Sequence, residues 1–220
     1  MITPLNIHTH LQPQPIYAAI QNCYPETFNE SEEGWFSVGI HPWKVQGYQQ
    51  QYPWALLRCQ AALPQVVAIG EAGLDKLCDY RLDEQERVFR QQAALAEELS
   101  KPLIIHLVKS TDELLRIRKD LRPSMPWIIH GFRGKPAQAQ SLLSHGCNLS
   151  FGALYHPESL RLTPFSRLFL ETDEADVPIK SLVEKAAEIK GISLEEMKQI
   201  LTSNVKNTFT SIGCGSENCK

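Results

Sequence analysis

Two histidines lie one position apart near the start of the chain, in the apolar stretch LNIHTHLQ. Side chains alternate between the two faces of an extended strand, so His8 and His10 are expected to point the same way. Two imidazoles on one face can bind a metal ion, although an HxH pair also occurs on surfaces and in hydrogen-bonded cores. The metal interpretation therefore requires further ligands elsewhere in the chain.

Four more ionisable residues end apolar, β-branched runs: Glu71 in VVAIGEAGLD, His106 in PLIIHLVKS, His130 in WIIHGF and Asp173 in LFLETD. An unpaired charge buried at such a run is costly, and metal coordination offsets that cost. Any one of these groups could be a hydrogen-bonded core residue, but six at corresponding positions favour a shared site. Four histidines and two carboxylates match a hydrolytic centre for one or two divalent ions.

The elements that must position these residues alternate between strand-like and helix-like patterns. The apolar runs recur roughly every 20 to 35 residues, which is about the length of one βα unit. Between them lie amphipathic segments such as residues 83–99, a predicted helix with Asp83 as a candidate cap. This alternation predicts a parallel sheet in which Glu71, His106, His130 and Asp173 each end a strand.

Eight strands are reached only if residues 16–23 form a strand, in which case the first helix is nearly absent. We predict that strand, and with it a single α/β domain over residues 1–220 that forms a (β/α)8 TIM-like barrel, slightly trimmed near the N-terminus. Barrel enzymes place their sites at the carboxyl ends of the strands, where these polar residues fall. A doubly wound open sheet is the alternative, but it would concentrate its ligand at one switch point.

Composition narrows the class and the location of the protein. The 220 residues are 43% hydrophobic and 21% charged, typical of a globular protein, and the net charge of −3 argues against a non-specific nucleic-acid binder. No apolar run is long enough for a transmembrane helix, so no membrane partner is expected. The six cysteines lack CxxC spacing, and the HxH pair occupies the place of a cleaved signal; both predict a cytoplasmic protein. Cys214 and Cys219 are expected in a loose tail.

The ordered series NIHTHL, SVGIHPW, VVAIGEAGLD, PLIIHL, WIIHGFRG, NLSFGA, LFLETD and SNVKNTF resembles the TatD family of metal-dependent hydrolases, within the broader amidohydrolase-like barrels. The resemblance covers about residues 5–209. It implies a TIM-like barrel and divalent-metal-dependent DNA hydrolysis, often from 3′ ends. It also implies two divalent ions (Mg, Mn or Zn), the first held by His8, His10, Glu71 and Asp173, the second by Glu71, His106 and His130, with Glu71 bridging.

Departures from the family pattern bear on the substrate rather than on the ligands. Asn6 stands where the family usually has Asp, Val108 where Arg is common, and Glu174 where a small residue is customary. The missing Arg removes a candidate phosphate clamp, because guanidinium suits bidentate phosphate contact. Lys76, Lys109 or Arg133 could replace it, or could be solvated loop charges.

His41, in GIHPW, also follows a strand-like run. It could contact substrate, support a metal ligand, or simply pack.

The predicted mechanism is attack by a metal-activated water, with Glu71 and Asp173 as catalytic carboxylates. Asp173 could orient or deprotonate the water while it contacts the first ion, and no GxSxG nucleophile motif competes. The prediction is a hydrolase of ester bonds, a deoxyribonuclease whose partner is DNA or another small phosphoester. The alternatives are an amide, ester or lactone hydrolase acting on a carbonyl substrate at the same site, and a metal-binding protein without turnover. No oligomeric state is predicted.

Overall fold

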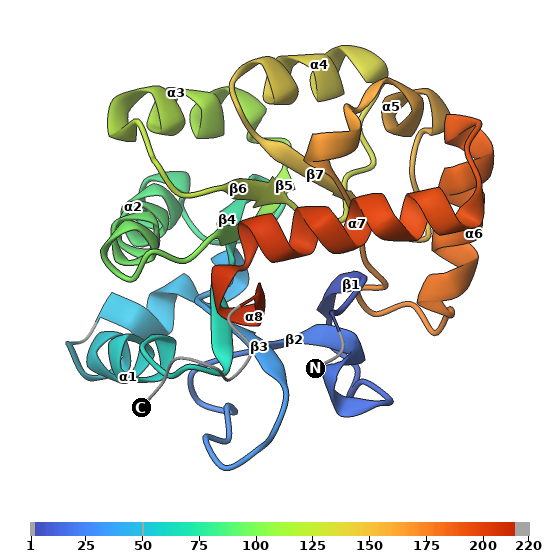
Figure 1. The fold of residues 1–220 in the computed structure, drawn as a ribbon. Helices are drawn as coiled ribbons and strands as arrows, with labels where there is room; N and C mark the ends of the chain where they lie inside the picture. Colours follow the sequence, from blue (N-terminus) through green and yellow to red (C-terminus); the bar gives the residue numbers. More distant parts are fainter. Residues whose placement is uncertain (1–2, 50, 214–220) are drawn as a thin grey trace. The chain divides into compact units, whose positions relative to one another are not determined.

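The computed structural model describes residues 3–49 and 51–213. Its strands follow chain order around a closed barrel, which confirms the predicted (β/α)8 fold. Helices lie in the connections between the strands (Figure 1). The strands are β1 (Asn6–Thr9), β2 (Ala19–Cys23), β3 (Trp35–Val38), β4 (Val66–Asp75), β5 (Leu103–Val108), β6 (Trp127–Ile129), β7 (Asn148–Phe151) and β8 (Leu168–Leu170).

The helices are α1 (Gln51–Ala61), α2 (Leu82–Glu98), α3 (Thr111–Leu121), α4 (Pro136–Ser144), α5 (Pro157–Leu162), α6 (Ile179–Lys190), α7 (Leu194–Thr208) and α8 (Thr210–Gly213), with 3-10 helices η1 (Ile16–Ala18), η2 (Pro42–Gln49) and η3 (Phe165–Arg167). Among the described residues, no helix combines the length and apolarity needed to cross a membrane. Cys214 and Cys219 lie outside the described residues.

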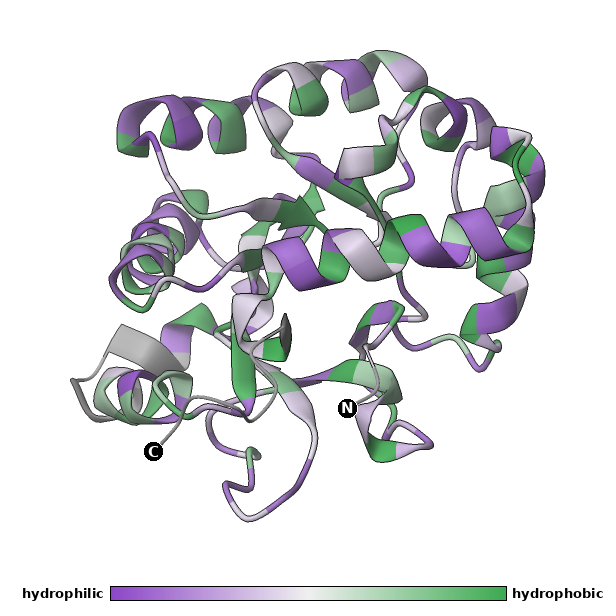
Figure 2. Ribbon diagram, viewed as in Figure 1, coloured by the Kyte–Doolittle hydropathy of each residue, from purple (hydrophilic) through white to green (hydrophobic). Residues whose placement is uncertain are grey.

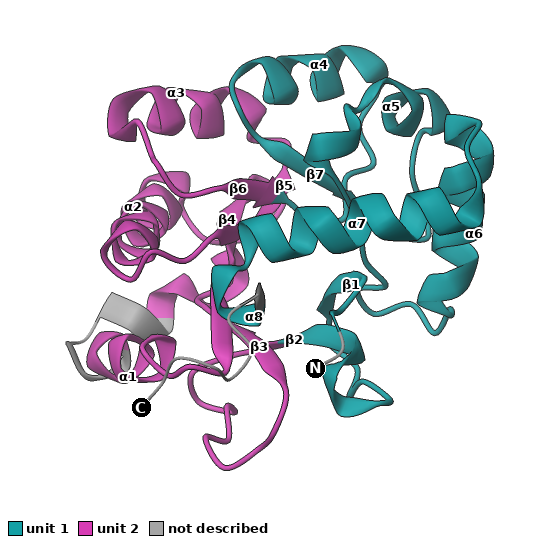
Figure 3. Cartoon of the chain, in the orientation of Figure 1, with its two compact units in different colours: residues 1–21, 129–220 teal, residues 22–128 magenta. Residues whose placement is uncertain are grey.

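Tertiary contacts divide the chain into two compact units (Figure 3). Unit 1 comprises residues 1–21 and 129–220, and unit 2 comprises residues 22–128. Each unit holds part of the predicted site and is described by itself below. The single-domain assignment stays a prediction.

The region after β1 is trimmed, as the sequence predicted. Ile16–Ala18 form the short 3-10 helix η1 where a full helix would connect two barrel strands, and Ala19–Cys23 form β2. In unit 1, β2 pairs in parallel with β1 through Asn6 opposite Ala19. The strand prediction is therefore correct for residues 19–23 and wrong for residues 16–18, which turn the chain in place of the missing helix.

In unit 1, β8 pairs in parallel with both β1 and β7.

The long helix α7 begins with a capping box, in which the Glu196 N–H donates to Ser193 Oγ (3.2 Å) and the Ser193 N–H donates to Glu196 Oε2 (2.9 Å). Its buried residues include Met197, Leu201 and Val205, which lie four residues apart on one face. Figure 2 shows the corresponding alternation of hydrophobic and hydrophilic segments along α7.

In unit 2, β3, β4 and β5 pair in parallel, and α2 packs against β4. Two buried glutamines on α2, seven residues apart, each form two hydrogen bonds with strand-end backbone. Gln92 accepts from the Ile40 N–H (2.7 Å) and donates to the Ile40 carbonyl (3.0 Å), and Gln85 does the same at Asp75 (2.7 and 3.0 Å). Gln85 thereby fixes the backbone of Asp75, and Gln92 fixes the backbone of the residue before His41.

Two sequence predictions about these elements need correction. Asp83 lies in the first turn of α2 and pairs with Arg81, so it does not cap the helix. Glu71 and His106 lie inside β4 and β5 and do not end them. The ladder continues beyond them through Leu74 opposite Leu107, and this stretch of β4 stays buried, so no turn interrupts the strand.

Candidate metal centre

In unit 1, backbone hydrogen bonds join the end of β1 to the segment after β8. The Asp173 N–H donates to the His8 carbonyl (3.1 Å), and the His10 N–H donates to the Asp173 carbonyl (3.1 Å). The hydroxyl of Thr9 also donates to that Asp173 carbonyl (3.1 Å). Asp173 has φ of +55°, a backbone conformation that non-glycine residues rarely adopt and that concentrates at functional sites. These contacts fix its carboxylate beside the two histidines.

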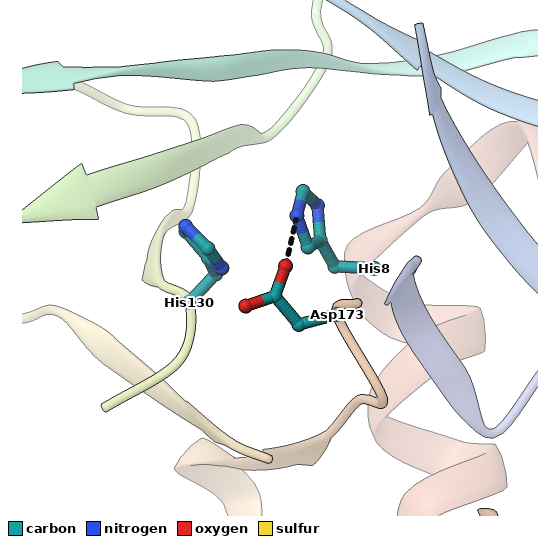
Figure 4. A group of neighbouring side chains, drawn as sticks. All are labelled: His8, His130 and Asp173. Atoms are coloured by element: carbon teal, nitrogen blue, oxygen red, sulfur yellow. Dashed lines mark ion pairs between the residues drawn. The ribbon is translucent and has the colours of Figure 1, made fainter. Parts of the chain in front are cut away.

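The side chains of His8 and His10 both lie near the Asp173 carboxylate. Asp173 Oδ1 lies 3.7 Å from His8 Nε2 and 3.7 Å from His10 Nε2. The ring of His130 lies 4.3 Å from that of His8, between centroids. Ligand atoms of His8, His130 and Asp173 all lie within 4.8 Å of one another (Figure 4). His8 is fully buried, whereas the Asp173 side chain is 27% exposed and can meet solvent or substrate.

Glu171, which the sequence analysis did not single out, is fully buried behind His130. Its Oε1 accepts from the Gly131 N–H (2.7 Å) and lies 3.1 Å from His130 Nδ1. Burial alone would raise the pKa of Glu171, but the neighbouring His130 and His8 hold that pKa below its usual value. A charged carboxylate next to Nδ1 favours the His130 tautomer that carries its proton on Nδ1. The lone pair of Nε2 is then available to a metal ion.

Asn6, where the family usually has Asp, joins β1 to the segment after β8. Its Nδ2 donates to the Thr172 hydroxyl (2.8 Å), and its Oδ1 accepts from the Thr172 N–H (3.1 Å). The amide both donates and accepts, which a carboxylate cannot do. Asn6 therefore holds the backbone next to Asp173 and has no role as a ligand.

In unit 2, the carboxylates of β4 and the histidine of β5 form a second group. His106 Nδ1 lies 2.9 Å from Glu71 Oε1, and His106 Nε2 lies 3.2 Å from Asp75 Oδ2. Gly73 pairs with His106, and a Cβ at Gly73 would fall 1.9 Å from the His106 carbonyl oxygen. Only glycine allows the two strands this approach. A neutral imidazole has a single N–H, so two carboxylates around one ring suit a site that also holds a cation.

His41 follows β3 and also reaches Glu71, with Nε2 3.2 Å from Oε1. Its Nδ1 accepts a hydrogen bond from the Trp43 N–H (3.1 Å), so the proton of the neutral ring is on Nε2 and is donated to Glu71. His41 therefore orients the Glu71 carboxylate, although the ligand atoms of His41, Glu71 and His106 lie within 4.8 Å of one another.

The remaining predicted substrate contacts differ in their surroundings. Arg133 lines a cavity of about 130 Å³ in unit 1 together with Asp173 and Glu174. Lys76 forms an ion pair with Glu113 of α3 (2.7 Å), which holds its ammonium over α3. Substrate contact by Arg133, Lys76 and His41 stays a prediction, as does the sharing of Glu71 between two ions.

The fold is a parallel (β/α)8 barrel, and its strands carry histidines and carboxylates at ligand spacing. These two features are typical of metal-dependent barrel hydrolases. The sequence profile described as TatD related DNase matches residues 17–210. The chain belongs to that family.

Two relatives and one solved structure show how far the similarity extends. The chain is 31% identical over 207 residues to the uncharacterized metal-dependent hydrolase YabD of Bacillus subtilis, covering 84% of this chain and 80% of YabD. It is 35% identical over 149 residues to the 3'-5' ssDNA/RNA exonuclease TatD of Erwinia amylovora, covering 63% of this chain and 57% of that enzyme. The crystal structure of YJJV, a TatD homolog from Escherichia coli K12, superposes with a TM-score of 0.79 at 20% identity, covering 95% and 99% of the two chains, and shows the same fold.

These findings confirm the predicted resemblance and the prediction of a TatD-type metal-dependent hydrolase. The cytoplasmic location stays a prediction.

Proposed function

We propose that this chain hydrolyses phosphodiester bonds of single-stranded DNA or RNA, with two divalent ions (Mg, Mn or Zn) held by its histidines and carboxylates. The observation that carries the proposal is the placement of Asp173 Oδ1 at 3.7 Å from Nε2 of both His8 and His10. Support for the substrate comes from the relative named as an ssDNA/RNA exonuclease.

The donor set in unit 1 fits a metal ion. A separation of 3.7 Å is too long for a hydrogen bond, but it suits two ligands that share an ion at about 2.0–2.2 Å from each. In the proposed arrangement His8, His10, Asp173 and Glu71 hold one ion, and Glu71, His106 and His130 hold the other. Imidazole nitrogens with carboxylate oxygens are the ligands of hydrolytic Zn and Mn sites.

The bound ions would supply a water of lowered pKa and neutralise charge that develops on the phosphoryl oxygens. Asp173 is partly exposed and fixed at its backbone, so it orients the attacking water and accepts its proton. Glu171 keeps His130 in the ligand tautomer, and His41 holds the Glu71 carboxylate in place. Arg133, beside Asp173, contacts a phosphate of the substrate.

The test incubates the protein with Mg²⁺, Mn²⁺ or Zn²⁺ and labelled single-stranded DNA or RNA, beside a panel of esters, amides and lactones. The proposal predicts metal-dependent shortening of the nucleic acid and little turnover of the panel. Intact nucleic acid under every metal, together with cleavage of a carbonyl compound, would establish the carbonyl hydrolase. Bound metal without any turnover would indicate a non-catalytic metal protein.

Asp173→Asn tests the proposed base directly. The variant keeps the size of the side chain but cannot accept the water proton, so we expect a loss in kcat of about 100-fold or more with an unchanged circular dichroism spectrum. Asp176→Asn, an exposed carboxylate three residues further on, should keep wild-type activity. Equal activity of the Asp173 variant and the wild type would remove Asp173 from the mechanism.

A further inference from the structure

An open cavity of about 610 Å³ lies in unit 2 beside the Glu71 and His106 group, and His106 belongs to both. Its size falls within the range of sites that bind small organic ligands. The residues that line it are Trp43, Asp75, Leu77, Cys78, Asp79, Tyr80, His106 and Val108. The mechanism described above uses only His106 from this set.

The indole of Trp43 forms a fixed and accessible wall of this cavity. Its Nε1–H donates to Asp75 Oδ2 (2.8 Å), and its ring meets the His41 ring edge to face at 4.8 Å between centroids. Trp43 is nevertheless 58% exposed. A large apolar ring that is held in one orientation and left open to solvent is suited to stacking with a flat partner.

The other walls show which part of a substrate fits. Leu77, 72% exposed, and Val108 are apolar, whereas Asp75 and Asp79 are acidic, and the described lining residues include neither lysine nor arginine. The carboxylates oppose a phosphate, so the anionic part of a substrate belongs at the metal ligands and an uncharged part belongs here.

The two acidic walls differ in what they can still bind. Asp75 Oδ2 accepts from the Trp43 indole and lies 3.2 Å from His106 Nε2, and Asp75 Oδ1 accepts from the Leu77 N–H (2.8 Å), so both oxygens already have partners. Asp79 is exposed and can accept from an amino group of a base.

We propose that this cavity receives one unpaired nucleobase of the substrate, stacked on Trp43, while the adjoining phosphodiester lies at the metal ligands. This inference rests on the proposed nuclease function. Every base presents a π face, so stacking selects an unpaired base with little preference for its identity. Trp43 would therefore make the enzyme prefer single-stranded substrates that carry a base at one defined position.

The experiment uses labelled oligodeoxynucleotides in which an abasic residue replaces each of the last few nucleotides in turn. For wild type, we expect one abasic position to lower kcat/KM by roughly 5- to 100-fold, the range of base stacking on an aromatic side chain. In Trp43→Ala the ratio of kcat/KM for the base-bearing and abasic substrates should fall toward one. In Trp43→Phe, which keeps a ring face, most of the wild-type ratio should remain. The ratio of the two substrates is the readout, so a general loss of activity does not mimic the effect.

Phe165→Ala is the matched control, because it removes a ring that is 39% exposed and does not line this cavity. It should leave the position dependence at the wild-type value. A Trp43→Ala variant with the same position dependence as wild type would overturn the inference.

Binding of the same oligonucleotides to metal-free protein, followed by fluorescence anisotropy, gives a second readout that does not need turnover. Tighter binding of the base-bearing oligonucleotide, lost in Trp43→Ala, supports the cavity even where no metal restores cleavage. Absence of cleavage would count against the proposed nuclease, whereas equal affinity for base-bearing and abasic oligonucleotides would count against the cavity.

Discussion

Glu171 and Asp173 show how two neighbouring carboxylates after β8 take different roles. They lie two residues apart in the segment that follows β8. Glu171 is fully buried against His130, whereas Asp173 is partly exposed beside His8 and His10. Burial therefore separates a carboxylate that orients a ligand from one that can meet water.

Glu171→Gln should weaken metal binding while the fold persists. Glutamine keeps the volume and an acceptor for the Gly131 N–H, but it lacks the charge that fixes the His130 tautomer, and such changes cost about 10- to 100-fold in metal affinity. Titration calorimetry of Mn²⁺ or Zn²⁺ into chelator-treated protein measures the effect. Glu174→Gln, an exposed neighbour, should bind metal as wild type does; an unchanged affinity in the Glu171 variant would show that it does not orient the ligand.

The sequence predicted the groups with recognisable ligand chemistry but not their supports. Asp75 lies four residues after Glu71 on the same face of β4, with Gly73 between them, so strand periodicity could have identified it. Trp43 carried no such signal, because its role depends on the irregular backbone of η2 and on Asp75, which is distant in sequence.

At the scale of elements, the close pairing of β4 and β5 brings Glu71 and His106 within contact distance. Gly73→Ala should destabilise the protein by about 2–4 kcal/mol, because the new methyl group would overlap the His106 carbonyl, a backbone atom that cannot move independently. Urea unfolding measures this. Gly191→Ala, at a φ of +67° with nothing within 4 Å, should lose only the roughly 1–2 kcal/mol of backbone strain. A Gly73 variant no less stable than the Gly191 variant would contradict the packing account.

Glu97 of α2 gives a pH-dependent contribution to stability. Its carboxylate accepts from the N–H groups of Ser124 (3.1 Å) and Met125 (2.8 Å) and from the Ser124 hydroxyl. Burial opposes the charge, but these bonds hold the pKa of Glu97 below its usual value of 4.5. The stabilisation is therefore present above that value and is lost as the pH falls through the lower folded-state pKa.

Glu97→Gln should lower the free energy of unfolding by about 1–2 kcal/mol near neutral pH, and the difference from wild type should shrink in acid. Urea titrations at about pH 7 and about pH 3 compare the two, as the linkage between charge and stability requires. Glu98→Gln removes only an exposed ion pair with Arg58 and should cost about 0–1 kcal/mol. A difference at Glu97 that is constant with pH would show that its charge has no part in the stabilisation.

Strand positions were predictable because each barrel strand is an apolar run, but strand ends were not. β4 and β5 continue past Glu71 and His106 because their ladder extends to Asp75 opposite Val108, a pairing between distant segments. The connections also depart from a regular repeat. One 3-10 helix replaces the helix after β1, and no helix connects β2 to β3 among the described residues, since tertiary packing decides how short a connection can be.

At the scale of the whole molecule, family membership and the local geometry support one another. The family profile spans residues 17–210 and so does not include the HxH pair, while the structure brings that pair to Asp173. The proposed roles of His8 in β1 and of His10 just after it are thus supported by geometry that the profile match does not use.

The central claim is that these side chains hold two divalent ions, and elemental analysis of the purified chain tests it most directly. After exchange into metal-free buffer we expect about two ions per chain, and a chelator should remove them. Their removal should lower the thermal stability of the protein. Metal added back at roughly 100 times Kd should raise the free energy of unfolding by about 3 kcal/mol. His8→Ala should retain one ion. A chain that retains no metal, and whose melting temperature does not respond to saturating Mg²⁺, Mn²⁺ or Zn²⁺, would contradict the account.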